Sequence, residues 1–532
     1  MKTWDQDIAK LNQVEIAKLE KDGLDVLRDI EQYARLGFDA ITVGDFDRLK
    51  WLGLYVQRPK EDGFFMLRVK IPGGVLTAKQ VKVVAEIARE YGRDLLDITT
   101  RQSLQFHWIK VENLPAIFRR LEKVSLTTVA AAGDCPRNII SSPLAGIDPD
   151  ELFDASHIIR ELNRFFEYNR DFSNLPRKFK IAITTAPYNS IHAEINDIAF
   201  TPAEKEINGE TVTGFHVAVG GGLSAQPHLA QAVDIFVRPE EVLKVAVAAA
   251  AIFRDYGYRE KRNHARLKFL VADWGIDKFT AQLLDITGPL ATRGKDLTHG
   301  WNQGFFHGVH KQITPGFNYV GLTIPAGRLS GSQMAEIARV AEQYGNGELR
   351  SCNSQDLILI NIPDAKLEKL LSEPVIKTFS PESSSLIARS VTCTGKEFCP
   401  FAVAETKYNI QKIAQYVDEH ISSPVPLRLS ISGCRHSCGQ PQIADIGLLG
   451  HMVSIDGKAA EGFEIWVGGI LGPQRDLAVK LPGVVATENV GQALTKIIEF
   501  YKENRKAGEP FFAFVKRVGH FAFQEQIKNL VV

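Results

Sequence analysis

The sequence predicts an α+β protein that arose by internal duplication, with two small half-domains and two larger α/β domains related by a pseudo-two-fold axis. Residues 71–109 align without a gap with residues 324–362. A second pair of segments, 215–221 and 463–469, shares an alternating strand that ends in Gly-Gly. The small and the large repeat therefore alternate along the chain.

Each copy of the small repeat has the pattern of a strand, a helix and a second strand. A capping box marks the start of each helix, at Thr77–Gln80 and at Ser330–Gln333, because its hydroxyl and amide satisfy free backbone N–H groups of the first turn. Each helix is expected to end at Tyr-Gly, with Gly92 and Gly345 in the left-handed conformation typical of helix ends.

The duplication divides the chain into five predicted segments. These are a helical N-terminal extension (1–50), a first half-domain (51–125), a first large domain (126–290), a second half-domain (291–375) and a second large domain (376–532). The residues near 290–315 are rich in Gly and His and are expected to form a linker.

Composition excludes several classes of protein. Among 532 residues, 63 Lys and Arg balance 63 Asp and Glu, so no bulk positive charge favours nucleic acid. The longest apolar run, Val245 to Phe253, has nine residues, whereas a membrane span needs about 20. The N-terminus lacks the apolar core of a signal peptide, and six Cys are too few for a disulfide framework. We expect a soluble, cytoplasmic protein, monomeric and without nucleic-acid or membrane partners.

Four of the six cysteines form two close pairs, Cys393-x5-Cys399 and Cys434-x3-Cys438. Two such pairs, far apart in sequence, are typical of a four-thiolate site. Zinc ribbons favour C-x2-C, so the wider spacing favours an iron–sulfur cluster, while zinc and unpaired buried thiols remain alternatives. The remaining two, Cys135 and Cys352, are expected to be buried thiols.

Residues 99–107 alternate as a strand should, and one face is polar. That face carries Thr99, Arg101, Ser103, Gln105 and His107. In the second copy, Arg101, Gln105 and His107 are replaced by Ser354, Ile358 and Ile360. The difference suggests that the first copy alone binds an anion; a solvated strand face is the alternative.

Further cations lie on predicted strands or turns. Residues 64–71 alternate, with Arg68 on the face opposite the larger apolar residues. Residues 178–183 alternate too, so Lys178 and Lys180 share a face, about 7 Å apart. Arg137 lies in the turn-like stretch 133–138. Surface exposure is the ordinary alternative for each.

These motifs together resemble those of a known family. The segments FFMLRVK, TTRQSLQFHW, GDCPRNI, LPRKFK, TCTGKEFC and ISGCRHSCGQPQIADIG occur in this order. They resemble those of the sulfite and nitrite reductases that contain siroheme and a [4Fe–4S] cluster, over residues 50 to 525. The resemblance implies that the small repeats are ferredoxin-like half-domains.

The resemblance also implies residue roles. The cluster would be held by Cys393, Cys399, Cys434 and Cys438, and Cys438 would bridge to the siroheme iron. The anion would be surrounded by Arg68, Arg137, Lys178 and Lys180. The siroheme carboxylates would be contacted by Arg101, Gln105, Arg177 and, more weakly, Gln355.

The implied reaction is the six-electron reduction of sulfite to sulfide or of nitrite to ammonium. The chain has no flavin or nicotinamide motif, so ferredoxin is the expected electron donor. In the family, Lys-x-Lys is typical of sulfite enzymes and Lys-x-Asn of plant-type nitrite enzymes; Lys178 and Lys180 therefore favour sulfite. Arg435 and His436 depart from the usual Pro-Asn. A non-catalytic zinc protein is the alternative outside the family.

Overall fold

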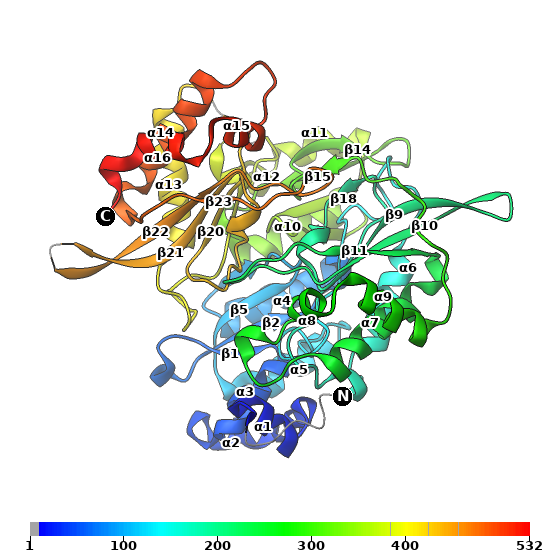
Figure 1. The fold of residues 1–532 in the computed structure, drawn as a ribbon. Helices are drawn as coiled ribbons and strands as arrows, with labels where there is room; N and C mark the ends of the chain where they lie inside the picture. Colours follow the sequence, from blue (N-terminus) through cyan, green and yellow to red (C-terminus); the bar gives the residue numbers. More distant parts are fainter. Residues whose placement is uncertain (1–9, 383–384, 424, 456) are drawn as a thin grey trace.

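The computed structural model describes residues 10–382, 385–423, 425–455 and 457–532 (Figure 1). Two five-stranded sheets and two six-stranded sheets are present among these residues, in the duplicated order expected. This confirms the predicted α+β fold class. No helix in these ranges is long and apolar enough to cross a membrane.

The two half-domain sheets exchange a strand. The first has the order β1(Leu54–Val56)-β2(Phe65–Val69)-β5(Leu104–Ile109)-β4(Leu95–Ile98)-β16(Arg328–Ser330). The second has the order β14(Gly308–Lys311)-β15(Phe317–Leu322)-β18(Leu357–Pro363)-β17(Glu348–Ser351)-β3(Val75–Thr77). Strand β16 therefore completes the sheet of the other half-domain, and β3 does the same in return. The two copies form one interlocked body, which the sequence did not predict.

The repeat helices α4 (Ala78–Tyr91) and α10 (Gly331–Tyr344) pack against each other. Both capping boxes form as predicted. The expected left-handed glycines are wrong, because φ is −114° at Gly92 and −113° at Gly345. The chain instead turns left-handed one or two residues later, at Arg93 and Gly347. Helix α5 (Leu114–Glu122) follows the first repeat, and α11 (Asp364–Ser372) and α12 (Pro374–Thr378) follow the second.

The two large units share one topology. In the first, β6(Ile140–Ser141), β7(Ile181–Ile183) and β9(Ile198–Ile207) pair in parallel, and β10(Glu210–Val219) and β11(Gln231–Val237) continue the sheet antiparallel. In the second, β19(Ser390–Thr392), β20(Leu429–Ser432) and β21(Ile446–Ile455) are parallel, and β22(Lys458–Val467) and β23(Val479–Lys480) antiparallel. A short strand, β24(Val485–Ala486), also pairs with β22.

Helices cover these sheets and enclose the cores. They are α6 (Ser156–Phe166), α7 (Val242–Tyr256), α8 (Leu267–Trp274) and α9 (Ile276–Thr287) in the first unit, and α13 (Lys407–His420), α14 (Val490–Asn504), α15 (Phe511–Val518) and α16 (His520–Ile527) in the second. Each unit has its own buried apolar cluster. Figure 1 shows the second large unit at the upper left, the first at the right, and strands β1, β2 and β5 of the first half-domain below the second unit.

The predicted linker near 290–315 is more ordered than expected. Strand β12(Lys295–Asp296) pairs with β9, and β13(Gly300–Trp301) pairs with β8(Tyr188–Asn189). These strands thus extend the first large unit, and the sheet of the second half-domain begins only at β14. Glycine content alone suggested a linker because it does not report pairing with a distant strand.

The N-terminal segment is helical and packs at one end of the molecule (blue in Figure 1). It contains α1(Gln13–Glu20), α2(Ile30–Leu36) and α3(Val43–Arg48). The fully buried Trp51 anchors it, since its Nε1 donates to the carbonyl of Ser173 at 2.6 Å. Lys18 of α1 also reaches the carboxylate of Asp134 in the first large unit, at 3.5 Å.

Candidate active site

The four paired cysteines come from two loops of the second large unit. Cys393 and Cys399 lie between β19 and α13, and Cys434 and Cys438 lie after β20. The Cys393 thiol accepts the N–H of Gly433 at 3.2 Å, which joins the two loops. Burial, together with the neighbouring Cys438, raises the pKa of Cys393 to about 12. The two loops therefore bring the four thiols to one region, in which Cys393, Cys399 and Cys434 are half-buried and Cys438 is exposed.

The chemistry of this site fits a cluster better than a single ion. Zinc bound by four thiolates at about 2.3 Å would bring the sulfurs within about 4 Å of one another. Among the described residues, no group of three or more His, Cys, Asp or Glu side chains is arranged to hold a metal ion, so the wide spacing within the two cysteine pairs is what favours the cluster. A cubane holds each thiolate on a different iron and needs a wider arrangement. Cys135 and Cys352, by contrast, are buried free thiols, as predicted.

The four predicted anion-binding cations converge on this region from other parts of the chain. The Arg68 guanidinium on β2 donates to Gln105 Oε1 at 3.0 Å. The Arg137 guanidinium is held by the carbonyls of Gly133 and Ala131. The charge of Cys438 acts on both Arg68 and Lys178, so these cations lie close to the thiol site.

The two lysines precede β7 rather than lie in it, because the regular strand begins only at Ile181. The predicted alternation persists, since Phe179 and Ile181 are fully buried while Lys178 and Lys180 are half-buried. Burial, Arg266 and Arg177 lower the pKa of Lys178 to about 7.

The pKa of Lys180 falls well below its usual value, again because of burial first and then neighbouring cations. Within the described ranges, neither lysine amine forms a hydrogen bond or an ion pair. The two amines are thus cationic donors that the protein itself leaves without acceptors.

The strand-face prediction for residues 99–107 is partly wrong. Strand β5 begins at Leu104, and the residues before it form a turn in which Gln102 has a φ of 57°. Arg101 is therefore on this turn, not on the strand face of Gln105. Its guanidinium reaches the first large unit, donating to Asn196 Oδ1 at 2.9 Å and to the carbonyl of Asn138 at 2.6 Å. Alternation in sequence could not reveal the turn.

The remaining residues predicted to contact siroheme differ in how far their polar atoms are already bound by other protein groups. Gln105 is buried and donates to Thr394 Oγ1 at 3.2 Å. Thr394 belongs to the loop between Cys393 and Cys399, called the cysteine loop below. Arg177 is half-buried and pairs with Asp134 at 3.2 Å. Gln355 donates to the carbonyl of Ile98 and accepts the N–H of Thr392. Gln355 thus joins two units with both ends of its amide, and this structural role accounts for it without a cofactor.

Gln355 and Gln102 are equivalent positions of the repeat, and they act alike. Gln102 accepts the N–H of Ser141 at 3.0 Å and donates to its carbonyl at 3.0 Å. Each glutamine therefore ties its half-domain to the first parallel strand of a large unit. Only the folded duplication makes this symmetry visible.

Two unpaired guanidinium nitrogens support a large anionic ligand in this space. Nε of Arg68 and Nε of Arg101 are buried, and neither has a hydrogen-bond partner. Unsatisfied buried donors are costly unless an acceptor fills the site. Siroheme carries eight carboxylates and would supply such acceptors. The donors present therefore fit siroheme beside the four-thiol site.

Sequence reasoning missed Tyr55 on β1. The Arg68 guanidinium lies over its ring, 5.8 Å from the centroid. Burial would raise the pKa of Tyr55, but Arg137, Arg68 and Arg177 outweigh it and lower the pKa. No motif marks this tyrosine, and only the pairing of β1 with β2 brings it beside the arginines.

The unusual Arg435 and His436 are both exposed. His436 Nδ1 lies 3.4 Å from the Cys434 thiol, and its ring contacts Phe401 edge-on. The part of the His436 side chain that is covered by protein, together with the charges of Lys178 and Arg177, lowers its pKa. The departure from Pro-Asn thus places an imidazole beside the Cys434 thiol, where the charge of Lys178 acts on it.

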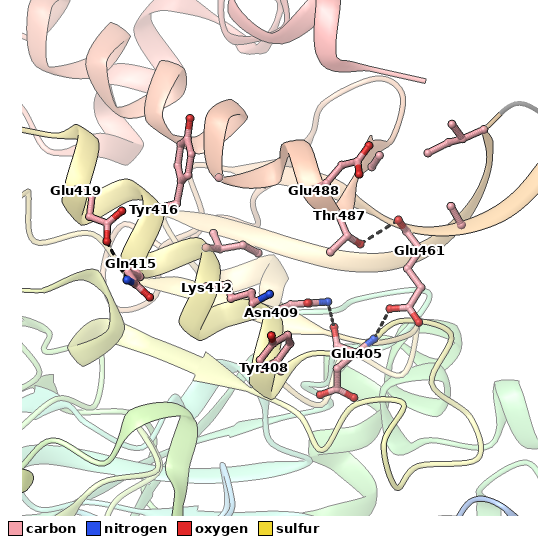
Figure 2. Close-up of a pocket in the computed structure, with 15 residues that line it drawn as sticks. Glu405, Tyr408, Asn409, Lys412, Gln415, Tyr416, Glu419, Glu461, Thr487 and Glu488 are labelled. Carbon is pink, nitrogen blue, oxygen red and sulfur yellow. Dashed lines mark hydrogen bonds between the residues drawn. The ribbon is translucent and has the colours of Figure 1, made fainter.

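A separate groove of about 720 Å³ lies between α13, α14 and the β21–β22 hairpin (Figure 2). Figure 2 shows Glu405 and Glu461 on its wall, where the Glu405 N–H donates to the Glu461 carboxylate at 2.8 Å. None of the predicted site residues lines it. The groove lies behind the cysteine loop, as Lys396 of that loop pairs with Glu461 at 2.7 Å.

Comparison with known proteins agrees with this geometry. Residues 132–288 and 383–531 match the "Nitrite and sulphite reductase 4Fe-4S domain", and residues 57–124 and 310–375 match the "Nitrite/Sulfite reductase ferredoxin-like half domain".

Similar whole proteins cover nearly the entire chain. A ferredoxin–nitrite reductase of Synechococcus elongatus is 42% identical over 92% of this chain and 96% of its own. A sulfite reductase [ferredoxin] of Mycobacterium tuberculosis is 37% identical over 95% of each chain. The solved structure of the Mycobacterium tuberculosis NirA protein superposes with a TM-score of 0.91, at 35% identity, over 96% of this chain and 97% of that one. The chain therefore belongs to the nitrite and sulfite reductase family, whose enzymes carry siroheme and a [4Fe–4S] cluster.

Proposed function

We propose that this enzyme reduces sulfite to sulfide in six one-electron steps, with ferredoxin as the donor. The observation that carries the proposal is the pair of lysine amines, Lys178 and Lys180, which the described protein leaves without acceptors. Near neutral pH sulfite exchanges between the hydrogensulfite monoanion and the sulfite dianion, whereas nitrite is only a monoanion. Two adjacent cations therefore favour sulfite on electrostatic grounds.

We assign the cluster to Cys393, Cys399, Cys434 and Cys438, which would hold it through their thiolates, and Cys438 would also link it to siroheme. The bound siroheme and cluster supply electrons to the anion. Arg68 and Arg137 are fixed by protein acceptors and would hold the substrate oxygens. Arg101, Gln105 and Arg177 are assigned to siroheme carboxylates, and Gln355 is left out because its amide joins two units.

The lysines have a second task, since each oxygen must leave as water and needs protons. With a pKa of about 7, Lys178 exchanges a proton readily near neutral pH. Lys180 has a still stronger tendency to release its proton, because burial and three cations act on it. An arriving anion offsets that repulsion and raises both pKa values, so substrate binding is expected to draw protons into the pocket.

The donor and the compartment are inferred from indirect support. The similar enzymes of Synechococcus and Mycobacterium are named for ferredoxin. The chain has no flavin or nicotinamide motif of its own. Six free cysteines fit a reducing cytoplasm, where reduced ferredoxin is available. A monomeric state remains a prediction from the sequence.

Nitrite is the second candidate substrate, because the nitrite reductase from Synechococcus elongatus has the higher identity, 42% against 37%. Identity over the whole chain reports shared fold and history, whereas the lysine pair bears directly on the charge of the substrate. We therefore keep sulfite as the proposed substrate.

Steady-state turnover of both anions with one reduced ferredoxin tests the assignment. We expect kcat/KM for sulfite to exceed that for nitrite, and each product to be found in proportion to ferredoxin oxidised, at six electrons per anion. A higher kcat/KM for nitrite would make nitrite the preferred substrate and refute the sulfite proposal.

A further inference from the structure

A buried ionic network lies next to the loop that carries Cys393 and Cys399. Asp97 on β4 is 2% exposed and accepts two hydrogen bonds from Arg328 on β16, at 2.8 and 3.2 Å. The Lys407 amine, at the start of α13, lies 3.4 Å from the same carboxylate. His107 Nε2 contacts it at 2.8 Å. Three cations or donors from three parts of the chain thus surround one carboxylate.

The charges in this network persist despite burial. Burial alone would raise the pKa of Asp97, but Lys407, Arg328 and His107 outweigh it and hold the pKa well below the usual value. Burial lowers the pKa of Lys407, and Asp97 counteracts this. For His107, burial outweighs Asp97 and lowers the pKa, which favours the neutral ring. Arg328 and Lys407 are positive and Asp97 is negative, and Glu397, the second partner of Arg328, makes the four charges neutral in sum.

The network touches the cysteine loop at several points. Arg328 also pairs with Glu397 of the loop at 2.7 Å. The ring of Phe398, next to Cys399, stacks on His107 with centroids 3.8 Å apart. The charge of Cys393 acts on Lys407. The loop that carries two of the four thiols is thus backed by fixed charges.

Helix α13 adds to this field. Its first residue is Lys407, and the preceding Thr406 donates its hydroxyl to the Cys393 carbonyl at 2.8 Å. The positive end of the helix dipole therefore faces the same loop as the Lys407 ammonium.

The duplication supplies an internal comparison. In the other copy, the alignment of the repeats replaces Asp97 by Arg350, His107 by Ile360 and Arg328 by Val75. Helix α6, the counterpart of α13, begins at Ser156 instead of Lys407. The network is thus found on the side of the molecule that carries the four cysteines. The equivalent positions on the other side do not have the residues that form it.

We propose that Asp97 and Arg328 are positioning residues that hold Lys407 at the start of α13, where the Lys407 charge raises the reduction potential of the [4Fe–4S] cluster. Reduction adds one negative charge to the cluster, and a nearby fixed cation stabilises that state. Easier reduction would let the cluster accept electrons from a weaker donor. The inference rests on the proposed ligation by four cysteines and not on the choice of sulfite.

The test is a redox titration of the cluster in the holoenzyme, followed by its EPR signal. Lys407→Met keeps the length and shape of the side chain but removes the charge. At a fixed solution potential, we expect the ratio of reduced to oxidised cluster to fall about tenfold. For a one-electron couple this corresponds to a lowering of the reduction potential by about 59 mV. Lys407→Arg keeps the charge, and the ratio should stay within about twofold of the wild type.

A matched control distinguishes the effect of a charge near the cluster from the effect of removing any buried lysine. Lys268 is also 2% exposed and donates to backbone carbonyls, including that of Leu223 at 2.9 Å, but no cluster cysteine acts on it. Lys268→Met should leave the potential of the cluster unchanged. If Lys407→Met does not fold, Lys407→Gln, which also lacks the charge, replaces it.

The outcomes distinguish this inference from the ligation on which it rests. A wild-type protein without four irons and four acid-labile sulfides per chain would refute the ligation. The inference alone would be refuted if the wild type contains a complete cluster and the uncharged Lys407 variant changes the ratio of reduced to oxidised cluster by less than about twofold. An equal shift in Lys407→Arg would also refute it, since geometry and not charge would then be responsible.

Discussion

Lys180→Asn is the change that bears most directly on the choice of substrate. The Lys180 side chain is half-buried, and its charge interacts with Arg101, Lys178 and Arg266 and with the opposite charge of Asp197. Asparagine keeps a hydrogen-bond donor and removes the positive charge. We expect the ratio of kcat/KM for sulfite to that for nitrite to fall about tenfold or more.

The magnitude follows from Coulomb's law. One unit of charge at about 4 Å contributes up to about 4 kcal/mol at an effective dielectric near 20. The sulfite dianion has one more negative charge than nitrite, so it loses this additional amount when the cation is removed. Two effects reduce the loss: the other three cations remain, and part of the binding energy goes into protonating Lys180, whose pKa is depressed. About a third of the upper bound, roughly 1.4 kcal/mol, already gives a tenfold change.

The assay is steady-state reduction of each anion by the same reductant, with siroheme and iron content measured on every sample. Lys180→Arg is the matched control, because it keeps the charge and should keep the ratio within about threefold. If Lys180→Asn leaves the ratio within about twofold while both anions are still reduced, Lys180 does not discriminate between them. The electrostatic argument for sulfite would then fail.

Three further changes test other parts of the site. Cys438→Ser should abolish six-electron turnover and the magnetic coupling between siroheme and cluster, measured by EPR; normal turnover would exclude a bridging role. Arg101→Ala should lower siroheme content more than iron–sulfur content by pigment and metal analysis, whereas Ser354→Ala, at the equivalent position, should change neither; a full siroheme complement in Arg101→Ala would contradict the assignment. Asp134→Asn removes a buried carboxylate from three cations 2.8 to 3.5 Å away and should cost about 3–5 kcal/mol of unfolding free energy in urea at pH 7. Burial would raise the pKa of Asp134, but its cations hold it below the usual value, so this contribution is present above about pH 4 and is lost as the pH falls further; equal stability of variant and wild type at pH 7 would contradict it.

The sequence by itself determined the features that depend on neighbouring residues. The capping boxes at Thr77 and Ser330 form because their partners lie three residues away. The alternation around Lys178 and Lys180 survives because one side of an extended segment must be buried wherever it packs. The order of the cysteine and cation motifs, together with the repeat, was enough to predict the fold class and the family.

Only the tertiary structure decided which distant segments meet. The exchange of β3 and β16 between half-domains, the turn that carries Arg101 and the pairing of Gln355 with two units have no local signal. The network around Asp97 likewise joins residues that lie 10 to over 300 positions apart in the chain. The physical reason is that backbone propensity and capping act within a few residues, whereas burial and ion pairing are determined by how the finished elements pack against each other.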